Sequence, residues 1–358
     1  MEGLQVRLDP GTAPGVASGN GQGNGTDDGT RRGRGSGLGR GRRHDRLRQA
    51  VGGTGNRRTG ATRPPHPGKL AGPPACASPR ARPVSSATAG SDLPPTGPLS
   101  RARGRLLARL HRRRTREREG LVLVEGPRAV ATALAAGATL RFVLLSDEDS
   151  TGEAGAIALR AREEGVELLR VPGDELSTAA DTVTPQGLLA VVEEPRTTLD
   201  ELPARGRIVL LDRVQDPGNA GTLIRSAAAF GAEAVVALDG TTDPWSAKCV
   251  RSSVGEAFRL PVLQAPWDRV HPWLQERGIP LLVADAGGQD VAASPLPPRG
   301  ALLVGSEAHG PRPEARSAAA HTLALPLARG VESLNAGVAG SVLLWALSNC
   351  TPTGPETP

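Results

Sequence analysis

Short apolar runs alternate with amphipathic stretches from about residue 101 to about residue 349. Runs that are rich in Val, Ile and Leu and bounded by polar or Gly-containing segments are typical of buried strands. The expected strands are residues 121–124, 142–145, 166–171 and 187–192, followed by 208–211, 234–238, 281–284, 301–304 and 322–325. Helical spacing between them predicts an α/β fold, with a mainly parallel sheet covered on both faces in the second half.

Three helices are predicted before residue 165: a short basic amphipathic helix over 101–118 and two further helices over about 128–136 and 153–164. The last helix, over about 333–347, is apolar nearly all round, which predicts burial within the domain or in an interface. It is too short to cross a membrane.

Composition divides the chain into five parts. Residues 1–100 are rich in Gly, Pro, Arg and Ser and cannot bury enough apolar surface to offset chain entropy, so they are predicted to be disordered. A small α/β domain is expected over 101–193, a polar, Pro-containing linker over 194–205 and a larger domain over 206–350. The last residues, 351–358, are predicted to be a second disordered tail.

Charge is distributed unevenly along the sequence. The first 120 residues carry 24 Lys and Arg against 8 Asp and Glu, whereas the remainder carries 19 against 29. The basic pI therefore belongs to the N-terminal third. If the partner is a nucleic acid, phosphate attraction must come largely from the tail and from the arginines of 101–118.

The chain has three cysteines, Cys76, Cys249 and Cys350, and none has Cys-x-x-Cys spacing. This argues against a disulfide framework or a zinc site and suits a reducing compartment. The start of the sequence lacks the apolar core of a signal peptide, and no apolar run approaches the length of a membrane span. A cytoplasmic location, with no membrane and no metal, is expected.

Three loops at expected strand ends carry candidate chemistry. The first is residues 216–225, in which Pro217 and Gly218 force a turn and either Asn219 or Thr222 is expected to cap a helix that stops near Gly231. The second is residues 305–310, where glycines permit close approach of a ligand. The third, residues 325–335, is bent by Pro and Gly and leads into the last helix. Ligands of open α/β sheets gather at the carboxyl ends of strands.

Together these loops resemble the SpoU (TrmH-like) family of RNA 2′-O-ribose methyltransferases, in the SPOUT superfamily. The resemblance covers about residues 103–350, and the first domain resembles the L30e-like substrate domain of the ribosomal-RNA branch, through 124–126 and 184–187. One departure is Arg329, where the family usually has Gly, with Gly330 one place later. The matching residues are Asn219, Gly221 and Arg225 in the first loop; Gly305, Ser306, Glu307 and Gly310 in the second; and Pro326, Ser333, Leu334 and Asn335 in the third, with Asp243, Pro244, Lys248, Arg251 and Gly255 in an intervening loop.

The resemblance implies a trefoil-knotted homodimer that uses S-adenosylmethionine and needs no metal. The candidate catalytic residues are Arg225, Asn219 and Glu307, with Glu307 expected to orient Arg225 or the Asn219 loop. The candidate cofactor-binding residues are Gly305, Ser306, Leu325, Pro326, Leu327, Ser333, Leu334 and Asn335. The candidate RNA-binding residues are Arg112, Arg113, Arg114, Arg116, Lys248 and Arg251.

The predicted activity is methyl transfer from S-adenosylmethionine to a ribose 2′-hydroxyl of RNA. The L30e-like domain favours 23S ribosomal RNA. Transfer RNA is the same-chemistry alternative. A non-catalytic RNA-binding or ribosome-assembly factor is the alternative from another class, although mere binding would not require Asn219, Arg225, Glu307 and Asn335 together.

Overall fold

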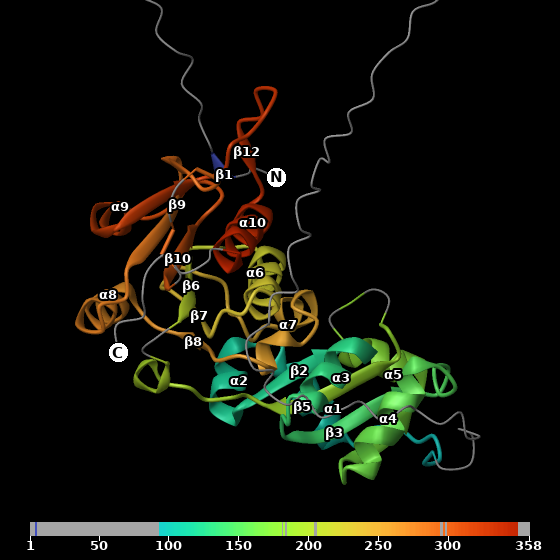
Figure 1. The fold of residues 1–358 in the computed structure, drawn as a ribbon. Coiled ribbons are helices and arrows are strands. Elements are labelled where there is room, and N and C mark those ends of the chain that lie inside the picture. The colour runs from blue at the N-terminus through green and yellow to red at the C-terminus, as the bar shows by residue number, and fades with distance from the viewer. Residues whose placement is uncertain are drawn as a thin grey trace, which may run out of the picture. The chain divides into compact units, whose positions relative to one another are not determined.

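Two sheets organise the part of the chain that the computed structural model describes, namely residues 4–5, 93–180, 182, 185–203, 206–293, 296–297 and 299–349. The teal and green elements of Figure 1 belong to a small domain, and the yellow to red elements belong to a larger, C-terminal domain. The α/β fold class expected from the sequence is confirmed. Most of the predicted tail 1–100, and all of the tail 351–358, lie outside the described residues.

The small domain contains a mixed four-stranded sheet in the order β2-β5-β3-β4. β5 runs antiparallel to both β2 and β3, and β3 runs parallel to β4. Side chains alternate between the faces, as in any strand. Val122 and Val124 pack with α3 and α4, whereas Leu123 packs with α1 and α5. The elements are α1 (Arg101–Leu110), α2 (Arg113–Glu119), β2 (Leu121–Glu125), α3 (Pro127–Ala135), β3 (Leu140–Ser146), α4 (Glu153–Glu163), β4 (Glu167–Val171), α5 (Gly173–Ala179) and β5 (Leu188–Glu193).

The single basic helix expected over 101–118 is wrong, because the structure breaks it into α1 and α2. Arg112 is extended, with φ −93° and ψ 124°. The guanidinium of Arg116 turns back and donates to the carbonyl oxygens of Leu110 and His111, at 2.9 and 3.0 Å. These bonds satisfy carbonyls that α1 leaves unpaired at its C-terminus. The chain leaves the helical conformation at Arg112, and the side chain of Arg116 then caps the C-terminus of α1.

The small domain also includes described residues before residue 101. The backbone N–H of Gly97 donates to the carbonyl oxygen of Arg170 at 3.0 Å, and Leu99 N–H donates to Glu175 Oε2 at 2.7 Å. Ser100 then caps α1 through Arg103 N–H. Residues 93–100, which composition assigned to the tail, thus pack against β4 and α5.

The C-terminal domain is built on a six-stranded parallel sheet in the order β11-β9-β10-β6-β7-β8. Between the domains lies a segment with one 3₁₀ turn, η1 (Leu199–Glu201), which is closed by a capping box of Thr198 and Glu201. The elements are β6 (Arg207–Asp212), α6 (Pro217–Ala229), β7 (Ala234–Ala237), α7 (Ala247–Ser252), η2 (Glu256–Phe258), β8 (Val262–Gln264), α8 (Trp267–Glu276), β9 (Leu281–Asp290), β10 (Gly300–Gly305), α9 (Pro313–Ala318), β11 (His321–Ala324), β12 (Ser333–Leu334) and α10 (Ala336–Ser348).

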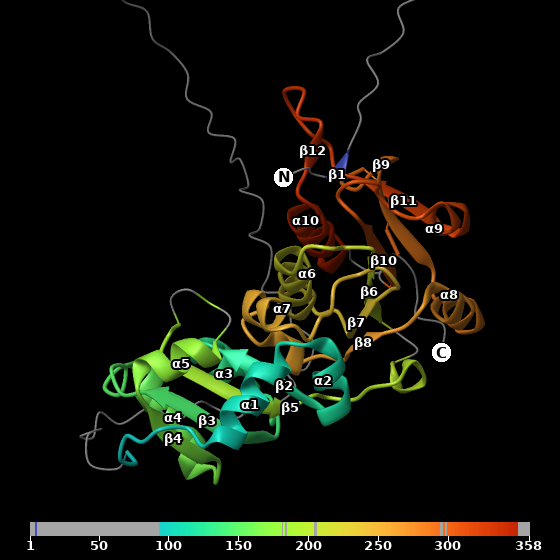
Figure 2. The same ribbon diagram turned by 180° about the vertical axis from the view of Figure 1, so that it is seen from behind.

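Helices cover both faces of this sheet. In Figures 1 and 2, α6, α7 and α10 lie on one side and α8 and α9 on the other. The central strand β6 serves both layers: Val209 and Leu211 pack with the α6 side, and Ile208 and Leu210 pack with the α8 side. All four side chains are at most 1% exposed. A strand that is buried on both faces has a continuous apolar sequence, and for this reason β6 could be predicted from the sequence.

The last helix, α10, begins at Ala336 rather than at Ser333. Ser333–Leu334 instead forms the short strand β12, which pairs antiparallel with β1 (Leu4–Gln5). No helix within the described ranges is long and apolar enough to cross a membrane.

Candidate functional site

The three candidate loops follow β6, β10 and β11, which run parallel to one another or to a shared neighbour. Their carboxyl ends therefore lie at the same edge of the sheet. Residues that are about 90 to 120 positions apart in sequence are brought together there by topology alone. This edge is the candidate active site.

The first candidate loop, residues 216–225, starts at the N-cap of α6, and its residues from Pro217 onward lie within that helix. Asp216, and not Asn219 or Thr222 as expected, is the capping residue, because its carboxylate accepts a hydrogen bond of 2.9 Å from the backbone N–H of Asn219. That bond, followed by the charge of Lys248 at 3.4 Å, holds the pKa of Asp216 below its ordinary value. At its far end, α6 stops before Gly231 as predicted, and Gly231 has a left-handed backbone with φ 71°.

Asn219 joins the first loop to the second and third. Its side-chain Nδ2 donates to Glu307 Oε1. A methyl group placed on Gly337 would lie 3.3 Å from Asn219 Oδ1 and 3.1 Å from Asn335 Oδ1. Asn335 caps α10 by accepting from the N–H of Val338 at 3.2 Å. Asn219 therefore bonds to Glu307 of the second motif and lies, with Asn335 of the third, around Gly337 at the start of α10.

Arg225 lies on the exposed side of α6. Among the residues that the structure describes, it makes no hydrogen bond or ion pair. Glu307 contacts Asn219 instead of Arg225, so of the two alternatives predicted for Glu307 the structure contains the contact with the Asn219 loop. The guanidinium is consequently available to an external anion.

The second loop is fastened to β6 by a buried ion pair that the sequence analysis missed. Asp212, at the end of β6, is fully buried and accepts from Arg312 through Nε at 2.8 Å and through the backbone N–H at 2.7 Å. Arg312 also contacts Asp239 after β7, at 3.2 Å. Burial opposes the charge of Arg312, but these two carboxylates outweigh it and raise its pKa. The sequence did contain a signal for this ion pair, because Asp212 is a charged residue at the end of an otherwise apolar strand.

Gly305 and Ser306 form the base of the second loop. A methyl group on Gly305 would overlap the backbone of Gly310 and Pro311, so only glycine fits. The hydroxyl of Ser306, which is 6% exposed, accepts from the N–H of His309 at 3.2 Å. The tight turn places its backbone at the carboxyl end of β10.

The third loop crosses the same edge. Leu325 is buried, Leu327 packs partly buried against the core, and Pro326 between them is exposed. Arg329 and Gly330 both have left-handed backbones, with φ 59° and 70°. Arg329, which stands where the family usually has Gly, therefore adopts a backbone conformation that glycine would adopt without strain. Ser333 and Leu334 lie in β12 and precede the cap Asn335.

The six predicted RNA contacts divide into two groups. Arg112 and Arg114 are exposed, Arg113 is exposed and contacts Glu117 and Gln264, and Lys248 is exposed beside Asp216. Arg116 is only 4% exposed and contacts Asp243, while Arg251 forms an ion pair of 2.7 Å with buried Glu125. The structure thus leaves the first group exposed, whereas Arg116 is buried and Arg251, which is 30% exposed, is paired with Glu125.

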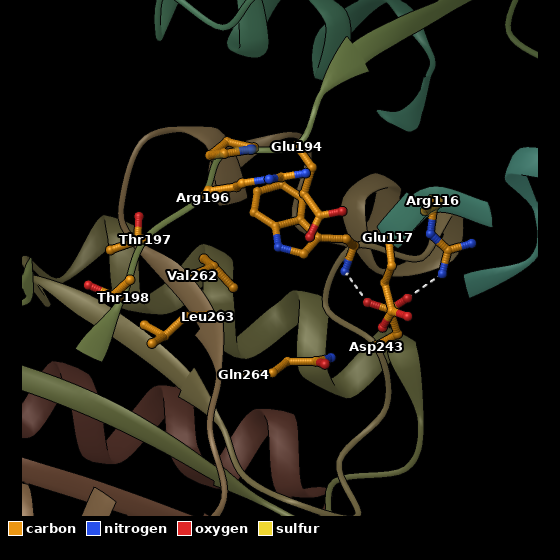
Figure 3. A pocket seen from close by; sticks show the side chains of 12 residues that line it. Arg116, Glu117, Glu194, Arg196, Thr197, Thr198, Asp243, Val262, Leu263 and Gln264 are labelled. Carbon is orange, nitrogen blue, oxygen red and sulfur yellow. Dashed lines mark hydrogen bonds and ion pairs between the residues drawn. The ribbon is translucent and has the colours of Figure 1, made fainter. Parts of the chain in front are cut away.

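A cavity of about 210 Å³ lies between α2, residues 194–198 and β8. Figure 3 shows Arg116 and Asp243 facing each other on one side of it, with Glu194 and Arg196 nearby. Burial, reinforced by the charge of Asp243, raises the pKa of Glu194. Asn219, Arg225 and Glu307 do not line this cavity, so it is distinct from the candidate active site.

Cys249, by contrast, is fully buried in α7. Burial raises the pKa of its thiol to about 12. A thiol that stays protonated at neutral pH is a packing residue and not a nucleophile.

Comparison with known proteins agrees with this geometry. The SpoU rRNA Methylase family model matches residues 206–345, and the MRM3-like substrate binding domain model matches residues 104–190. The 23S rRNA (guanosine(2553)-2'-O)-methyltransferase RlmP of Bacillus subtilis is 31% identical over 240 residues, which are 67% of this chain and 93% of the relative. The mitochondrial rRNA methyltransferase 3A of Danio rerio is 32% identical over 283 residues, and the match spans 64% of this chain and 64% of that relative.

A solved structure shows the same architecture. The SpoU methyltransferase AviRb from Streptomyces viridochromogenes, in complex with the cofactor AdoMet, superposes with a TM-score of 0.61 at 30% identity, over 69% of this chain and 97% of that one. Sequence, fold and motif geometry lead to one conclusion: the chain belongs to the SpoU rRNA methylase family.

Proposed function

We propose that the chain transfers a methyl group from S-adenosylmethionine to a ribose 2′-hydroxyl of ribosomal RNA. The observation that carries the proposal is that Asn219 bonds to Glu307 and lies with Asn335 around Gly337, so that residues of all three motifs gather at the carboxyl edge of the parallel sheet. Its relatives include enzymes named for 23S rRNA 2′-O-methylation, which makes large-subunit ribosomal RNA the first substrate to test.

The residues of the second and third loops fit an adenosine-containing cofactor. Leu327 offers partly exposed apolar surface in the same bent segment as buried Leu325, and Gly305 and Ser306 form a tight turn at the carboxyl end of β10. Planar heterocycles are held by this combination of apolar walls and a few backbone donors and acceptors. When bound, S-adenosylmethionine supplies an already activated methyl group, so the protein's task is positioning and charge stabilisation.

Arg225 is the residue that we assign to the reacting hydroxyl. A guanidinium is a poor proton acceptor, because arginine is effectively always charged in proteins. As an exposed cation on α6 it can orient an RNA phosphate and stabilise the negative charge that develops on the ribose oxygen. Proton loss then goes to phosphate or water. Asn219, fixed by Asp216 through its backbone and by Glu307 through its amide, holds the loop in place.

RNA is held, in this proposal, by the exposed cations Arg112, Arg113, Arg114 and Lys248. Lys248 lies 3.4 Å from Asp216, which places a positive charge at the start of the helix that carries Arg225. Phosphate contacts of this kind are independent of base sequence and weaken with salt.

The helix α10 favours a homodimer. Val338, Val342 and Trp345 are spaced to share one face of the helix and are 48%, 40% and 56% exposed. An exposed apolar stripe on a helix whose other side is buried is typical of a subunit interface. Trp345→Asp should shift the chain from dimer to monomer in light scattering, while Trp267→Asp, on α8, should not. The proposal also includes a trefoil knot in the C-terminal domain and a cytoplasmic location for the protein.

The test is transfer of labelled methyl from S-adenosylmethionine to total RNA and to unmodified transcripts. Arg225→Ala should lower the rate by about 10²–10³, the cost of losing one preorganised charge contact. Its unfolding free energy should stay within about 0.5 kcal/mol, because the side chain is exposed. Arg259→Ala, an exposed arginine of the same domain, is the matched control.

Label in large ribosomal RNA that disappears with Arg225→Ala supports the proposal. Label in transfer RNA keeps the chemistry and replaces the substrate. Absence of label in every RNA, alongside measurable cofactor binding, would replace the enzyme by an RNA-binding factor. Near-normal turnover of Arg225→Ala would remove Arg225 from the mechanism.

A further inference from the structure

The segment 243–255, which contains α7, is held by the small domain at both of its ends. At its start, Asp243 contacts Arg116 of α2, and near its end Arg251 contacts Glu125 of β2. The sequence predicted Arg116 and Arg251 as RNA contacts. Their positions in the structure give them a different partner, a carboxylate of the other domain in each case.

The first contact is nearly closed to solvent. The side chains of Arg116 and Asp243 are 5% and 16% exposed. Arg116 also donates to two carbonyl oxygens at the end of α1, and Asp243 accepts from the backbone N–H of Trp245 at 2.9 Å. Figure 3 shows the pair beside the interdomain cavity. Each ion is therefore oriented by further hydrogen bonds of its own domain.

The second contact contains a buried carboxylate. The side chain of Glu125 is 2% exposed and lies 2.7 Å from Arg251, which is 30% exposed. Thr182 of the small domain donates to the other carboxylate oxygen of Glu125. A buried charge without its partner is strongly destabilising. Glu125 therefore requires Arg251 to remain in place.

Close packing connects this segment to the helix of the first motif. A methyl group on Gly221 of α6 would lie 2.6 Å from the carbonyl oxygen of Cys249 and 2.9 Å from the N–H of Ser253. A methyl group on Gly255 would lie 2.6 Å from the carbonyl oxygen of Ala129 in α3. Tightly packed interiors transmit displacements. A shift of the small domain would consequently reach the helix that carries Arg225.

We propose that the pairs Arg116–Asp243 and Arg251–Glu125 form an interdomain clamp, which positions the RNA-holding domain relative to α6. Arg116 and Arg251 are in this view positioning residues and make no contact with RNA. The kinetic consequence rests on the proposed function, because the clamp acts on methyl transfer only if RNA is held by the small domain.

The variant Glu125→Gln distinguishes a role of Arg251 in the clamp from a contact between Arg251 and an RNA phosphate. If Arg251 binds RNA, removing a nearby negative charge is neutral for RNA affinity or improves it. If Arg251 belongs to the clamp, Glu125→Gln weakens the same ion pair as Arg251→Met and must impair the enzyme in the same way. Gln is nearly isosteric with Glu and keeps hydrogen-bonding capacity, so the fold should survive.

The experiment compares Arg251→Met, Glu125→Gln, the double variant and the conservative Arg251→Lys in the full chain. We expect kcat to fall by about 10-fold or more in both single neutralised variants, since misplacement by 1 Å can cost ~10². The KM for RNA and the affinity for S-adenosylmethionine should change less than about twofold. The double variant should lose less than the product of the singles, as expected for contacting residues, and Arg251→Lys should recover part of the rate. Arg259→Met, from a surface pair with Glu256 next to the same segment, should behave as wild type.

A second readout does not depend on activity. All four tryptophans, at 245, 267, 273 and 345, lie in the C-terminal domain. Tryptophan fluorescence therefore follows that domain, while far-UV circular dichroism follows both. Urea midpoints from the two probes should coincide in wild type and Arg259→Met and should separate in Arg251→Met and Glu125→Gln.

The outcomes distinguish the clamp from the proposed function. Impaired Arg251→Met with unimpaired Glu125→Gln, or a raised KM for RNA with unchanged kcat, would overturn the clamp in favour of an RNA contact. Unchanged kinetics with coincident midpoints in both variants would also overturn it. If wild type methylates no RNA, the proposed function fails, and the midpoints alone decide: separation supports the clamp and coincidence rejects it. If Arg251→Met does not fold, Glu125→Gln and Arg251→Lys carry the test.

Discussion

Gly340 provides the sharpest test of how the first motif helix and the last helix are packed. A methyl group on Gly340 of α10 would lie far inside contact distance of Leu223 Cδ2 and 3.0 Å from Val304 Cγ2. Carbon atoms prefer separations of about 3.5–4.0 Å. Leu223 and Val304 are both fully buried, on α6 and on the central strand β10, so neither can turn away.

Gly340→Ala sets two effects against each other. Alanine is favoured over glycine in a helix interior by about 1 kcal/mol. Inserting a methyl group into a filled core costs about 1–3 kcal/mol. Because both neighbours are fixed, we expect the packing cost to exceed the helical gain and the unfolding free energy to fall by about 1 kcal/mol. For a chain of this size the melting temperature should fall by about 2–4 °C.

Gly104→Ala is the matched control, since Gly104 lies in α1 and a methyl group there meets nothing within 4 Å. It should gain up to about 1 kcal/mol. Urea unfolding followed by circular dichroism measures both variants. If Gly340→Ala is as stable as wild type or gains as much as Gly104→Ala, the close approach of α10 to α6 and β10 is not as described. A loss in both would instead point to a general effect of replacing glycine.

Three further changes should alter stability in a predictable direction, each measured by urea unfolding across pH. Asp216→Ala removes the α6 cap and should lower the unfolding free energy by about 1 kcal/mol. The bond from Asn219 lowers the pKa of Asp216. The stabilisation by the Asp216 carboxylate is therefore complete above the ordinary aspartate pKa of about 4 and disappears as pH falls through the lowered pKa. Burial, with Asp243 nearby, raises the pKa of Glu194, so Glu194→Gln should stabilise the protein at pH 8 and make no difference below about pH 4; greater stability of wild type at pH 8 would refute this. Arg329→Gly relieves a left-handed backbone and should gain up to about 1 kcal/mol, whereas Arg329→Ala should gain nothing.

The strands were predictable because each is a buried apolar run that ends at a Gly- or Pro-containing loop. β8 (Val262–Gln264) was missed because three residues are too few to show a pattern. β9 extends past its apolar start to Asp290, through Gly287 and Gly288, and there pairs with β11 across a register shift. Its polar half is a strand only because of that partner, which local sequence does not show.

The site was predictable to the level of its loops. Parallel strands send their carboxyl ends to one edge, so the proximity of residues 219, 307 and 335 follows from topology. The capping residue did not follow, because Asp216, Asn219 and Thr222 are all good caps and only the backbone geometry selects Asp216. Likewise, nothing in the run 112–118 distinguishes the one arginine that is buried. Arg116 differs from its neighbours through its bonds to the carbonyl oxygens at the end of α1 and through Asp243, which is 127 positions away.

The clamp residues also encode an orientation. The small domain contributes one cation and one anion, Arg116 and Glu125, and the C-terminal domain contributes the complementary anion and cation, Asp243 and Arg251. Docking the small domain with the two contacts exchanged would set arginine against arginine and carboxylate against carboxylate, which disfavours the wrong arrangement. A chimera that grafts a foreign RNA-holding domain onto this catalytic domain would therefore need both charges, in this order along its sequence, to dock in register.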